Sequence, residues 1–263
     1  MLKFLKHPLT RSLDLDDPRT TLLRRRIIQE KHFLRMIYQD WYGWIASSLP
    51  PDNQPVLELG SGAGFLDQYI PGLITSEIFP SPTVRIVLDG CTLPFADASL
   101  SAIVMIDVFH HIPDVLSFLH EAVRCIKPGG TVLMVEPWVT VWSAWIYSRL
   151  HHEPFDPDAP EWAFPSMGPL SGANSALPWI VFKRDRELFE SCLPDLSIKE
   201  IKVERPFLYL LSGGVSLRSI MPNFTFGMWK RLEHAMAPMN RWIGMFARIT
   251  LRRSHHFHHT ASS

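Results

Sequence analysis

VLELGSGAGF, residues 56–65, joins a short apolar strand pattern to a glycine-rich turn. Gly60 allows a tight turn out of the strand. Gly62 and Gly64 let a ligand come close to the backbone, because glycine has no Cβ atom to collide with it. We expect a short helix over residues 64–72 to follow, with free N–H groups at its start. A turn of this kind suits several nucleotide-like ligands.

The spacing of the glycines argues against two kinds of nucleotide site. A dinucleotide-binding loop reads G-x-G-x-x-G and places a pyrophosphate against the following helix. This turn reads G-x-G-x-G, which is one residue shorter, and it lacks the G-K-[S/T] sequence of a Walker loop. Glu58 lies two residues before Gly60, where a carboxylate would repel a pyrophosphate and attract a cationic ligand.

Two further carboxylates stand at the ends of predicted strands. Glu77 lies roughly 20 residues beyond the turn, the spacing at which an acidic residue binds ribose hydroxyls. Asp89 ends a third strand and is placed to accept a hydrogen bond from the exocyclic amine of adenine. Together with Glu58 they indicate a nucleoside with a cationic, amine-bearing extension and no phosphate.

Strand and helix patterns alternate through this region, which indicates a parallel α/β sheet. A stop and turn is expected at residues 127–130, and residues 197–214 are expected to add two strands at an antiparallel edge. Helical spacing from Pro18 to Ser48, after the capping residue Asp17, predicts one or two helices behind an arm of residues 1–15. The other predicted strands are residues 55–60, 73–78, 84–90, 101–108 and 131–137, and the other predicted helices are residues 113–126 and 185–193.

The ordered motifs resemble those of class I S-adenosylmethionine-dependent methyltransferases, most closely the type 11 group that acts on small molecules. The segments that carry the resemblance are ELGSGAGF, DGCTLPFADASLSAIVMIDVFHHIPD and CIKPGGTVLMVEP, within residues 54–137. The resemblance implies an α/β fold: a Rossmann-like, seven-stranded, mostly parallel sheet with helices on both faces, an N-terminal helical extension and C-terminal amphipathic helices. It also implies S-adenosylmethionine as the cofactor and methyl transfer as the reaction.

The same resemblance implies which residues contact the cofactor. Glu77 replaces the aspartate often found at its position, and its longer side chain is expected still to reach the ribose. Structural alternatives stay open for the carboxylates, which could bond the turn backbone (Glu58), be solvated (Glu77), cap a turn (Asp89) or contribute only backbone (Asp107). The implied contacts are Glu58, Gly60, Ser61, Gly62, Gly64, Glu77, Asp89, Gly90 and Asp107.

Histidines supply most of the candidate general bases. Methyl transfer from a sulfonium mainly requires alignment and exclusion of water, so a base helps only if the acceptor is a hydroxyl or a protonated amine. We expect no metal site, because adjacent histidines rarely point at one ion without further ligands, and metal bound by the terminal HHFHH (residues 255–259) would be adventitious. The candidates are His110, His111, His151, His152 and Glu153, with a structural role as the alternative for His110 and His111.

Residues 141–182 interrupt the α/β pattern. A second element is expected to follow the strand of residues 131–137. Residues 151–179 are too rich in proline for a helix and too apolar for a linker, and long irregular segments of compact domains often form lids or substrate loops. The aromatic residues of the whole segment favour a lipophilic or aromatic acceptor, with a saccharide as second choice, and they leave open whether O, N or C is methylated. Together with Trp138, which precedes the segment, these aromatic residues are Trp142, Trp145, Trp162, Phe164 and Trp179.

Residues 226–253 show the pattern of a basic amphipathic helix that Pro238 kinks. Apolar residues from Trp229 to Ile249 fall near one stripe, and arginine and lysine supply the charge. The stripe either packs on the protein's own core or on a second copy, or it contacts a membrane surface or an anionic partner.

Composition narrows the setting. The chain is 46% hydrophobic and 20% charged with a formal net charge of zero, so we expect a buried core and no nucleic-acid partner. Three cysteines without a CxxC spacing fit a reducing compartment. Neither a signal peptide nor an apolar run of ~18 residues is present. We therefore expect a cytoplasmic protein, either free or peripheral to a membrane, of undetermined oligomeric state.

These features divide the chain into five expected parts. They are an N-terminal arm with helices (1–50), a cofactor-binding core (51–140), a lid or acceptor segment (141–182), the last helix and strands (183–214) and a basic amphipathic tail (215–263). The leading interpretation is methyl transfer to a small, lipophilic or aromatic acceptor. The alternative is a non-catalytic binding or assembly module at a membrane surface that keeps the fold and the cofactor.

Overall fold

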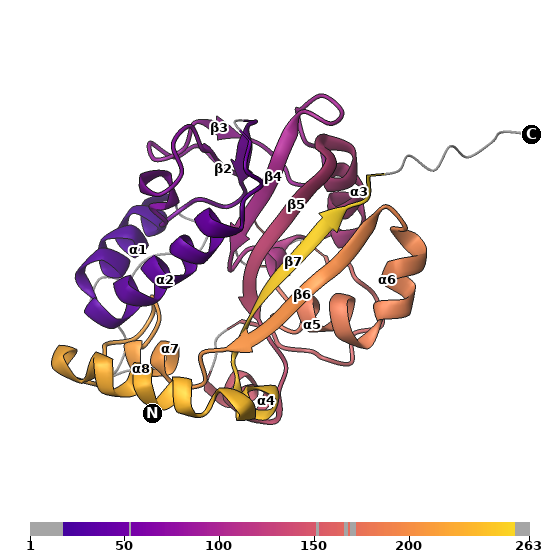
Figure 1. The fold of residues 1–263 in the computed structure, drawn as a ribbon. Coiled ribbons are helices and arrows are strands. Elements are labelled where there is room, and N and C mark those ends of the chain that lie inside the picture. The colour runs from indigo at the N-terminus through magenta and orange to yellow at the C-terminus, as the bar shows by residue number, and fades with distance from the viewer. Residues whose placement is uncertain (1–17, 53, 151–152, 166–167, 169–171, 256–263) are drawn as a thin grey trace, which may run out of the picture.

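One mixed sheet with helices on both of its faces forms the protein (Figure 1). The computed structural model describes residues 18–52, 54–150, 153–165, 168 and 172–255. The expected arm of residues 1–15 and the capping residue Asp17 lie outside the described residues. Among the described residues, no helix combines the length and the apolar character needed to cross a membrane.

Seven strands form the sheet in the order β3-β2-β1-β4-β5-β7-β6. The first five in this order run parallel, whereas β7 is antiparallel to both of its neighbours. This arrangement confirms the predicted Rossmann-like, mostly parallel sheet. The strands are β1 (Val56–Glu58), β2 (Ile74–Glu77), β3 (Ile86–Val87), β4 (Leu100–Ile106), β5 (Ile126–Pro137), β6 (Leu196–Glu204) and β7 (Phe246–Arg253).

Helices cover both faces because alternate residues of the central strands enter two different cores. Ile103 and Met105 of β4 pack in one core with α3, α5 and α6, and Ala102 and Val104 pack in the other with α1, α2 and α4. Figure 1 shows α1 and α2 on one side of the sheet and α3, α5 and α6 on the other. The helices are α1 (Pro18–Glu30), α2 (His32–Ser48), α3 (Val115–Cys125), α4 (Val141–Leu150), α5 (Leu177–Trp179), α6 (Arg186–Cys192), α7 (Leu208–Ser212), α8 (Phe226–Ala235) and α9 (Asn240–Ile243).

Strand β7 is the main departure from the sequence-based expectation. The prediction of one kinked helix over residues 226–253 is wrong for residues 246–253, which lie between β5 and β6. Phe246 and Ile249 belong to the predicted helical stripe, but they are 2% and 0% exposed in the sheet. Ladder hydrogen bonds on both edges and burial on both faces outweigh the helical pattern here. The basic side chain of Arg248 is accommodated by donating to Glu204 Oε1 at 2.9 Å.

Two predicted strand boundaries are also wrong. Leu208–Ser212 is helix α7, so residues 197–214 supply only one strand, β6. Lys127–Gly130 continues β5 instead of ending the preceding helix with a turn. The pairing with β4 shifts register between Leu100 and Ala102, and this irregularity absorbs the extra residues, with Gly129 at a left-handed φ of 79°.

Two helix predictions differ as well. The helix expected over residues 64–72 is reduced to a single 3-10 turn, Leu66–Gln68, so no full helix N-terminus follows the glycine turn. Residues 151–179, expected to be too rich in proline for a helix, contain α5, and Ile180–Arg184 is a π-helical turn. Helix α4 is the second element expected after the strand of residues 131–137, and its residues hold no proline.

A buried arginine ties the C-terminal helices to the sheet. Arg205 is 7% exposed and donates to Asp40 of α2 at 2.7 Å. Its guanidinium nitrogens also lie 3.6 Å from Glu204 and 3.5 Å from Glu233 of α8. Glu233 in turn accepts hydrogen bonds from two backbone N–H groups at the start of α7. One cation therefore contacts three carboxylates from α2, β6 and α8, of which Glu204 also pairs with Arg248 and Asp40 with Lys230.

We predict that Arg205→Met lowers the free energy of unfolding by about 3–5 kcal/mol, because it leaves the buried Glu233 without its cation. Arg186→Met is the matched control, since Arg186 forms only an exposed i,i+4 pair with Glu190 and should change stability little. Urea titration followed by circular dichroism measures both. A loss for Arg205→Met no larger than that of the control would contradict a structural role of this network.

Candidate functional site

A cavity of about 870 Å³ lies outside the carboxyl ends of the parallel strands. Its wall includes Glu58 at the end of β1, Glu77 at the end of β2 and Asp107 just after β4. Helix α1, helix α4 and the loop of residues 213–217 close the opposite side. Ligands of open α/β sheets bind at this edge, and the volume lies near the upper end of the range of about 300–1,000 Å³ typical of ligand pockets.

The glycine turn forms the floor of the cavity, and the protein itself requires its glycines. Gly60 and Gly62 have left-handed φ values of 61° and 27°. A Cβ atom would lie 2.5 Å from Val108 Cγ2 at Gly60 and 2.6 Å from Glu77 Oε1 at Gly62. Ser61 ties the turn to β2, since its N–H donates to Ser76 O at 2.8 Å. A side chain at Gly62 would therefore displace the carboxylate expected to bind ribose.

Glu58 and Glu77 are both buried, at 5% and 7% exposure. Burial, with the negative charges of Asp67 and Glu77 nearby, raises the pKa of Glu58 to about 7. Burial also raises the pKa of Glu77. A cation close to these two carboxylates would favour their ionised forms. This part of the cavity therefore suits a cationic ligand.

Asp89 is exposed at the far end of the cavity, and Gly90 follows it. One oxygen of its carboxylate accepts from the N–H of Cys91 at 2.8 Å, so Asp89 does cap a turn. The second carboxylate oxygen is still available as an acceptor for a ligand amine, since a carboxylate has about four acceptor positions. The turn-capping alternative and the ligand-binding expectation are therefore compatible.

Glu136 of β5 positions the segment that follows β4. Its carboxylate is fully buried and accepts from Val108 N at 2.9 Å, Phe109 N at 2.8 Å and His110 Nδ1 at 2.7 Å. Asp107 precedes this segment with a left-handed φ of 61°, and its N–H donates to Val135 O. Burial, together with Glu153 and Glu136, raises the pKa of Asp107 to about 7.

The two histidines after β4 have different surroundings. His110 is fully buried and does not line the cavity, whereas His111 does. Burial lowers the pKa of His110, but its contacts with Glu136 and Glu153 outweigh burial, and the pKa is raised well above its usual value. Burial and the charge of His110 lower the pKa of His111 to about 4. His111 is therefore a neutral imidazole near pH 7.

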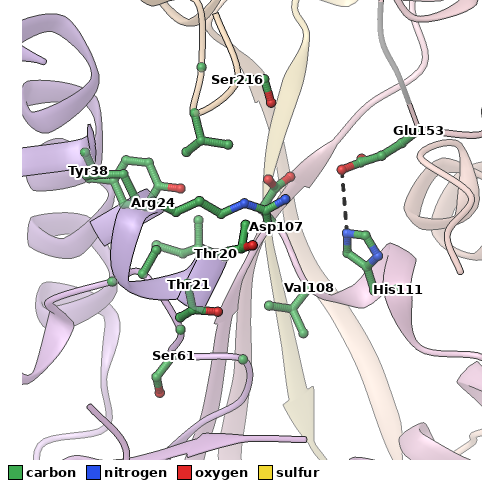
Figure 2. A pocket seen from close by; sticks show the side chains of 18 of the residues that line it. Thr20, Thr21, Arg24, Tyr38, Ser61, Asp107, Val108, His111, Glu153 and Ser216 are labelled. Atoms are coloured by element: carbon green, nitrogen blue, oxygen red, sulfur yellow. Dashed lines mark ion pairs between the residues drawn. The ribbon is translucent and has the colours of Figure 1, made fainter. Parts of the chain in front are cut away.

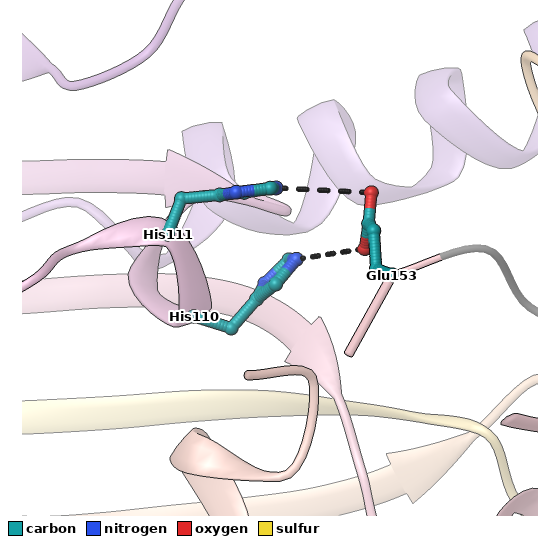
Figure 3. A group of neighbouring side chains, drawn as sticks. All are labelled: His110, His111 and Glu153. Atoms are coloured by element: carbon teal, nitrogen blue, oxygen red, sulfur yellow. Dashed lines mark ion pairs between the residues drawn. The ribbon is translucent and has the colours of Figure 1, made fainter. Parts of the chain in front are cut away.

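Glu153 brings a third group to these histidines. Its carboxylate oxygens lie 3.4 Å from His110 Nε2 and 3.8 Å from His111 Nε2 (Figure 3). His111 Nδ1 donates to Gly172 O at 2.9 Å. The predicted candidates His110, His111 and Glu153 are thus brought together, while His151 and His152 lie outside the described residues.

Helix α1 supplies cavity residues that the sequence analysis missed. Thr20, Thr21 and Arg24 line the cavity, and Arg24 extends across it toward Asp107 (Figure 2). Arg25 holds the glycine turn by donating to Gly64 O at 2.6 Å. No sequence motif identifies these positions. The helical pattern of residues 18–48 indicates which residues are buried, but not that α1 lies beside the glycine turn.

Lys31 fixes the loop that closes the cavity. Its ammonium group donates to the carbonyl oxygens of Gly214 at 2.5 Å and Leu217 at 2.7 Å. Burial lowers the pKa of Lys31 to about 8. The sequence does not predict this function, because a lysine between two helices is normally expected to be exposed to solvent.

The structure brings the residues predicted for the cofactor side together. All of the residues implied for cofactor contact line this one cavity, namely Glu58, Gly60, Ser61, Gly62, Gly64, Glu77, Asp89, Gly90 and Asp107. The aromatic residues proposed for the acceptor pocket do not line it, although all of them are described. Trp162, for example, packs in the core and donates to Asp185, and Trp142 donates to Pro206 O.

Comparisons with known proteins agree with this geometry. Residues 57–134 match the profile of the family described as Methyltransferase domain. An uncharacterized methyltransferase of Mycobacterium sp. (strain JLS) is 28% identical over 111 residues, which are 37% of this chain and 43% of that protein; its counterpart in strain KMS is 27% identical over the same shares. The match thus spans less than half the length of these curated relatives.

The fold also matches a solved structure. A chain of the complex of the Haloferax volcanii Trm112 methyltransferase activator with a candidate methyltransferase superimposes with a TM-score of 0.50 and 18% identity, covering 94% of this chain and 100% of that chain. This likeness concerns the fold alone. The profile match, together with the ordered motifs of the same stretch, assigns residues 57–134 to a methyltransferase domain of the class I S-adenosylmethionine-dependent family.

Proposed function

We propose that the protein transfers a methyl group from S-adenosylmethionine to a small, mainly lipophilic acceptor. The observation that carries this proposal is the single cavity, which joins all the expected cofactor residues to a second, largely apolar region. A methyltransferase needs both regions in one enclosed space, since donor and acceptor must be aligned within contact distance.

The cofactor side has the carboxylate acceptors that this ligand requires. Glu77 is placed to hold the ribose, Asp89 the adenine amine, and Glu58 the cationic methionine end. When bound, S-adenosylmethionine supplies a methyl group on a sulfonium, which is already a strong electrophile. The chain's own residues then have to orient the reactants and keep water out.

The acceptor side is lined mainly by hydrocarbon and phenol groups. They come from α1, α2, the turn after β4, α4, α7, residues 215–220 and the residue before β7, and this scattered origin explains why no local sequence motif identifies them. They include Ile28, Tyr38, Ile112, Ile146, Leu150, Tyr209, Leu210, Val215, Leu217, Ile220 and Met245. Such a lining favours a lipophilic acceptor over a saccharide, because few of these side chains can hydrogen-bond sugar hydroxyls.

Among the acid–base groups of the cavity, Asp107 is better matched than the histidines to accept a proton near neutral pH. Its pKa of about 7 lies close to the operating pH, whereas the pKa of about 4 makes His111 a weak base. His110 is fully buried and does not line the cavity. We therefore assign proton acceptance to Asp107 if the acceptor is a hydroxyl or a protonated amine.

The activity is tested by incubating the protein with S-adenosylmethionine labelled in the methyl group and a lipid extract of cells. We expect label in an organic-soluble product, and loss of at least about 90% of it with Gly62→Ala, whose methyl group would displace Glu77. Gly43→Ala is the matched control, since a Cβ there meets nothing within 4 Å. Label confined to water-soluble products would contradict the lipophilic acceptor, and binding without any transfer would favour the non-catalytic module.

The raised pKa of Glu58 predicts how cofactor affinity depends on pH. The free protein holds a proton on Glu58 below about pH 7, and a bound cation favours the ionised form, so binding releases a proton there. Affinity should rise by up to about tenfold per pH unit as the pH increases toward 7, and then level off. Calorimetry between about pH 5.5 and 8 measures this slope. Glu58→Gln should reduce the slope to the part that Asp107 contributes, since the pKa of Asp107 is also about 7. An unchanged slope in Glu58→Gln would show that Glu58 does not bind the cation.

We also propose that the face formed by the 3-10 turn Asn223–Thr225 with α8 and α9 contacts a membrane surface. Phe224, Met228 and Trp242 are 87%, 58% and 45% exposed, and Lys230, Arg231 and Arg241 are exposed beside them. Apolar side chains among cations suit an anionic bilayer surface. Phe226 and Glu233 on the other side of α8 are buried, so only the outer face is available.

Flotation with anionic vesicles tests this contact. We expect the wild-type protein to float, and Phe224→Asp with Met228→Asp to remain with the soluble fraction. Leu188→Asp is the control, because Leu188 is 52% exposed on α6, away from this face. Failure of the wild-type protein to float, or equal flotation of the double variant, would contradict the proposal.

A further inference from the structure

Three donor atoms converge on one point at the wall of the cavity. His110 Nε2, His111 Nε2 and a carboxylate oxygen of Glu153 lie within 4.8 Å of one another. Figure 3 shows both imidazoles directed at the Glu153 carboxylate. Two imidazoles and one carboxylate form a donor set suited to divalent first-row transition metals. The sequence analysis predicted no metal because a further ligand was lacking, and Glu153 supplies that ligand.

The separations of these atoms fit one bound ion. Glu153 Oε2 lies 3.4 Å from His110 Nε2, and Glu153 Oε1, the other oxygen of the same carboxylate, lies 3.8 Å from His111 Nε2. Two ligands that bind zinc at about 2.1 Å with tetrahedral angles are about 3.4 Å apart. Small side-chain adjustments therefore bring all three atoms into coordination distance.

The outer contacts of both histidines leave the correct nitrogen for a metal. His110 Nδ1 donates to Glu136 and His111 Nδ1 donates to Gly172 O, so both Nε2 atoms point toward Glu153. Ligating histidines in proteins usually have such an oxygen acceptor on the other ring nitrogen, because it fixes the tautomer and the ring orientation. The buried His110 Nε2 lies 3.4 Å from Glu153 Oε2, which is long for a hydrogen bond.

The local charge and the access route also favour a cation. Carboxylates of Glu136, Glu153 and Asp107 surround the two imidazoles. His111 and Glu153 line the cavity, with side chains that are each 17% exposed, so an ion can enter from the cavity side. From these observations, we propose that His110, His111 and Glu153 bind a divalent transition metal ion whose remaining coordination positions face the cavity.

The open positions suggest a use for the ion. A metal with three protein ligands keeps a position for water or for an oxygen of a substrate, as in catalytic zinc sites. We assign this position to an oxygen of the acceptor, a hydroxyl or carboxylate, which the ion would hold within the cavity. This use rests on the proposed methyl transfer, whereas metal binding itself does not.

Titration with Co²⁺ and with Zn²⁺ tests the site on the full chain. His255, His256, His258 and His259 are first replaced by glutamine, so that the terminal histidines bind no metal. We expect one Co²⁺ per chain with the intense visible absorption of a site of low coordination number, and a Zn²⁺-dependent rise in melting temperature. Calorimetry with S-adenosylhomocysteine on the same preparation tests the cofactor separately, so failure of one proposal is distinguishable from failure of the other.

Two variants localise the bound ion. Glu153→Gln and His111→Ala should each weaken Zn²⁺ binding at least roughly 100-fold, because each removes a ligand. His120→Ala, an exposed histidine of α3, is the control and should bind as the parent does. Circular dichroism confirms that each variant is folded. Absence of binding by the parent protein, or binding that survives both variants, would overturn the proposal.

Discussion

The site depends on the hydrogen bonds that the buried carboxylate of Glu136 accepts. The carboxylate accepts hydrogen bonds from two backbone N–H groups and from Nδ1 of His110. These bonds fix the path of the chain immediately after β4. Removing the carboxylate would leave these donors buried without partners, at a cost of about 1–3 kcal/mol each. Asp107 stands beside this anchor in a left-handed conformation that a non-glycine residue adopts only where its surroundings enforce it. The hydrogen bonds to Glu136 therefore set the positions of the side chains that follow β4.

The cofactor half of the site could be predicted because its determinants are local. Strand ends and the glycine turn place Glu58, Glu77 and Asp89 on one edge through parallel pairing alone. The acceptor half could not be predicted, because α1, α4 and the loop of residues 213–217 meet there through tertiary contacts such as those of Lys31. Glu136 itself left a signal that was not used, a carboxylate inside the apolar run VLMVEP.

The errors in the fold have a common physical origin. Residues 246–253 show a helical stripe, yet pairing with two strands decides their structure, since every residue of β7 has a partner in β5, in β6 or in both. Long-range contacts also decide the structure of α7. The chain leaves β6 at Arg205, which has a left-handed φ, and Glu233 of α8 then accepts hydrogen bonds from the N–H groups at the start of α7. Periodicity reports which residues are buried, but not which long-range partner buries them.

The central claim is that one cavity holds the cofactor on the glycine turn and directs its reactive end toward Asp107 and His111. A crystal structure with S-adenosylhomocysteine tests it most directly. The account predicts adenine beside Asp89, ribose hydroxyls on Glu77, and the sulfur facing Asp107 and the apolar side formed by α1 and α4. Cofactor density elsewhere, or a sulfur facing away from that side, would contradict it.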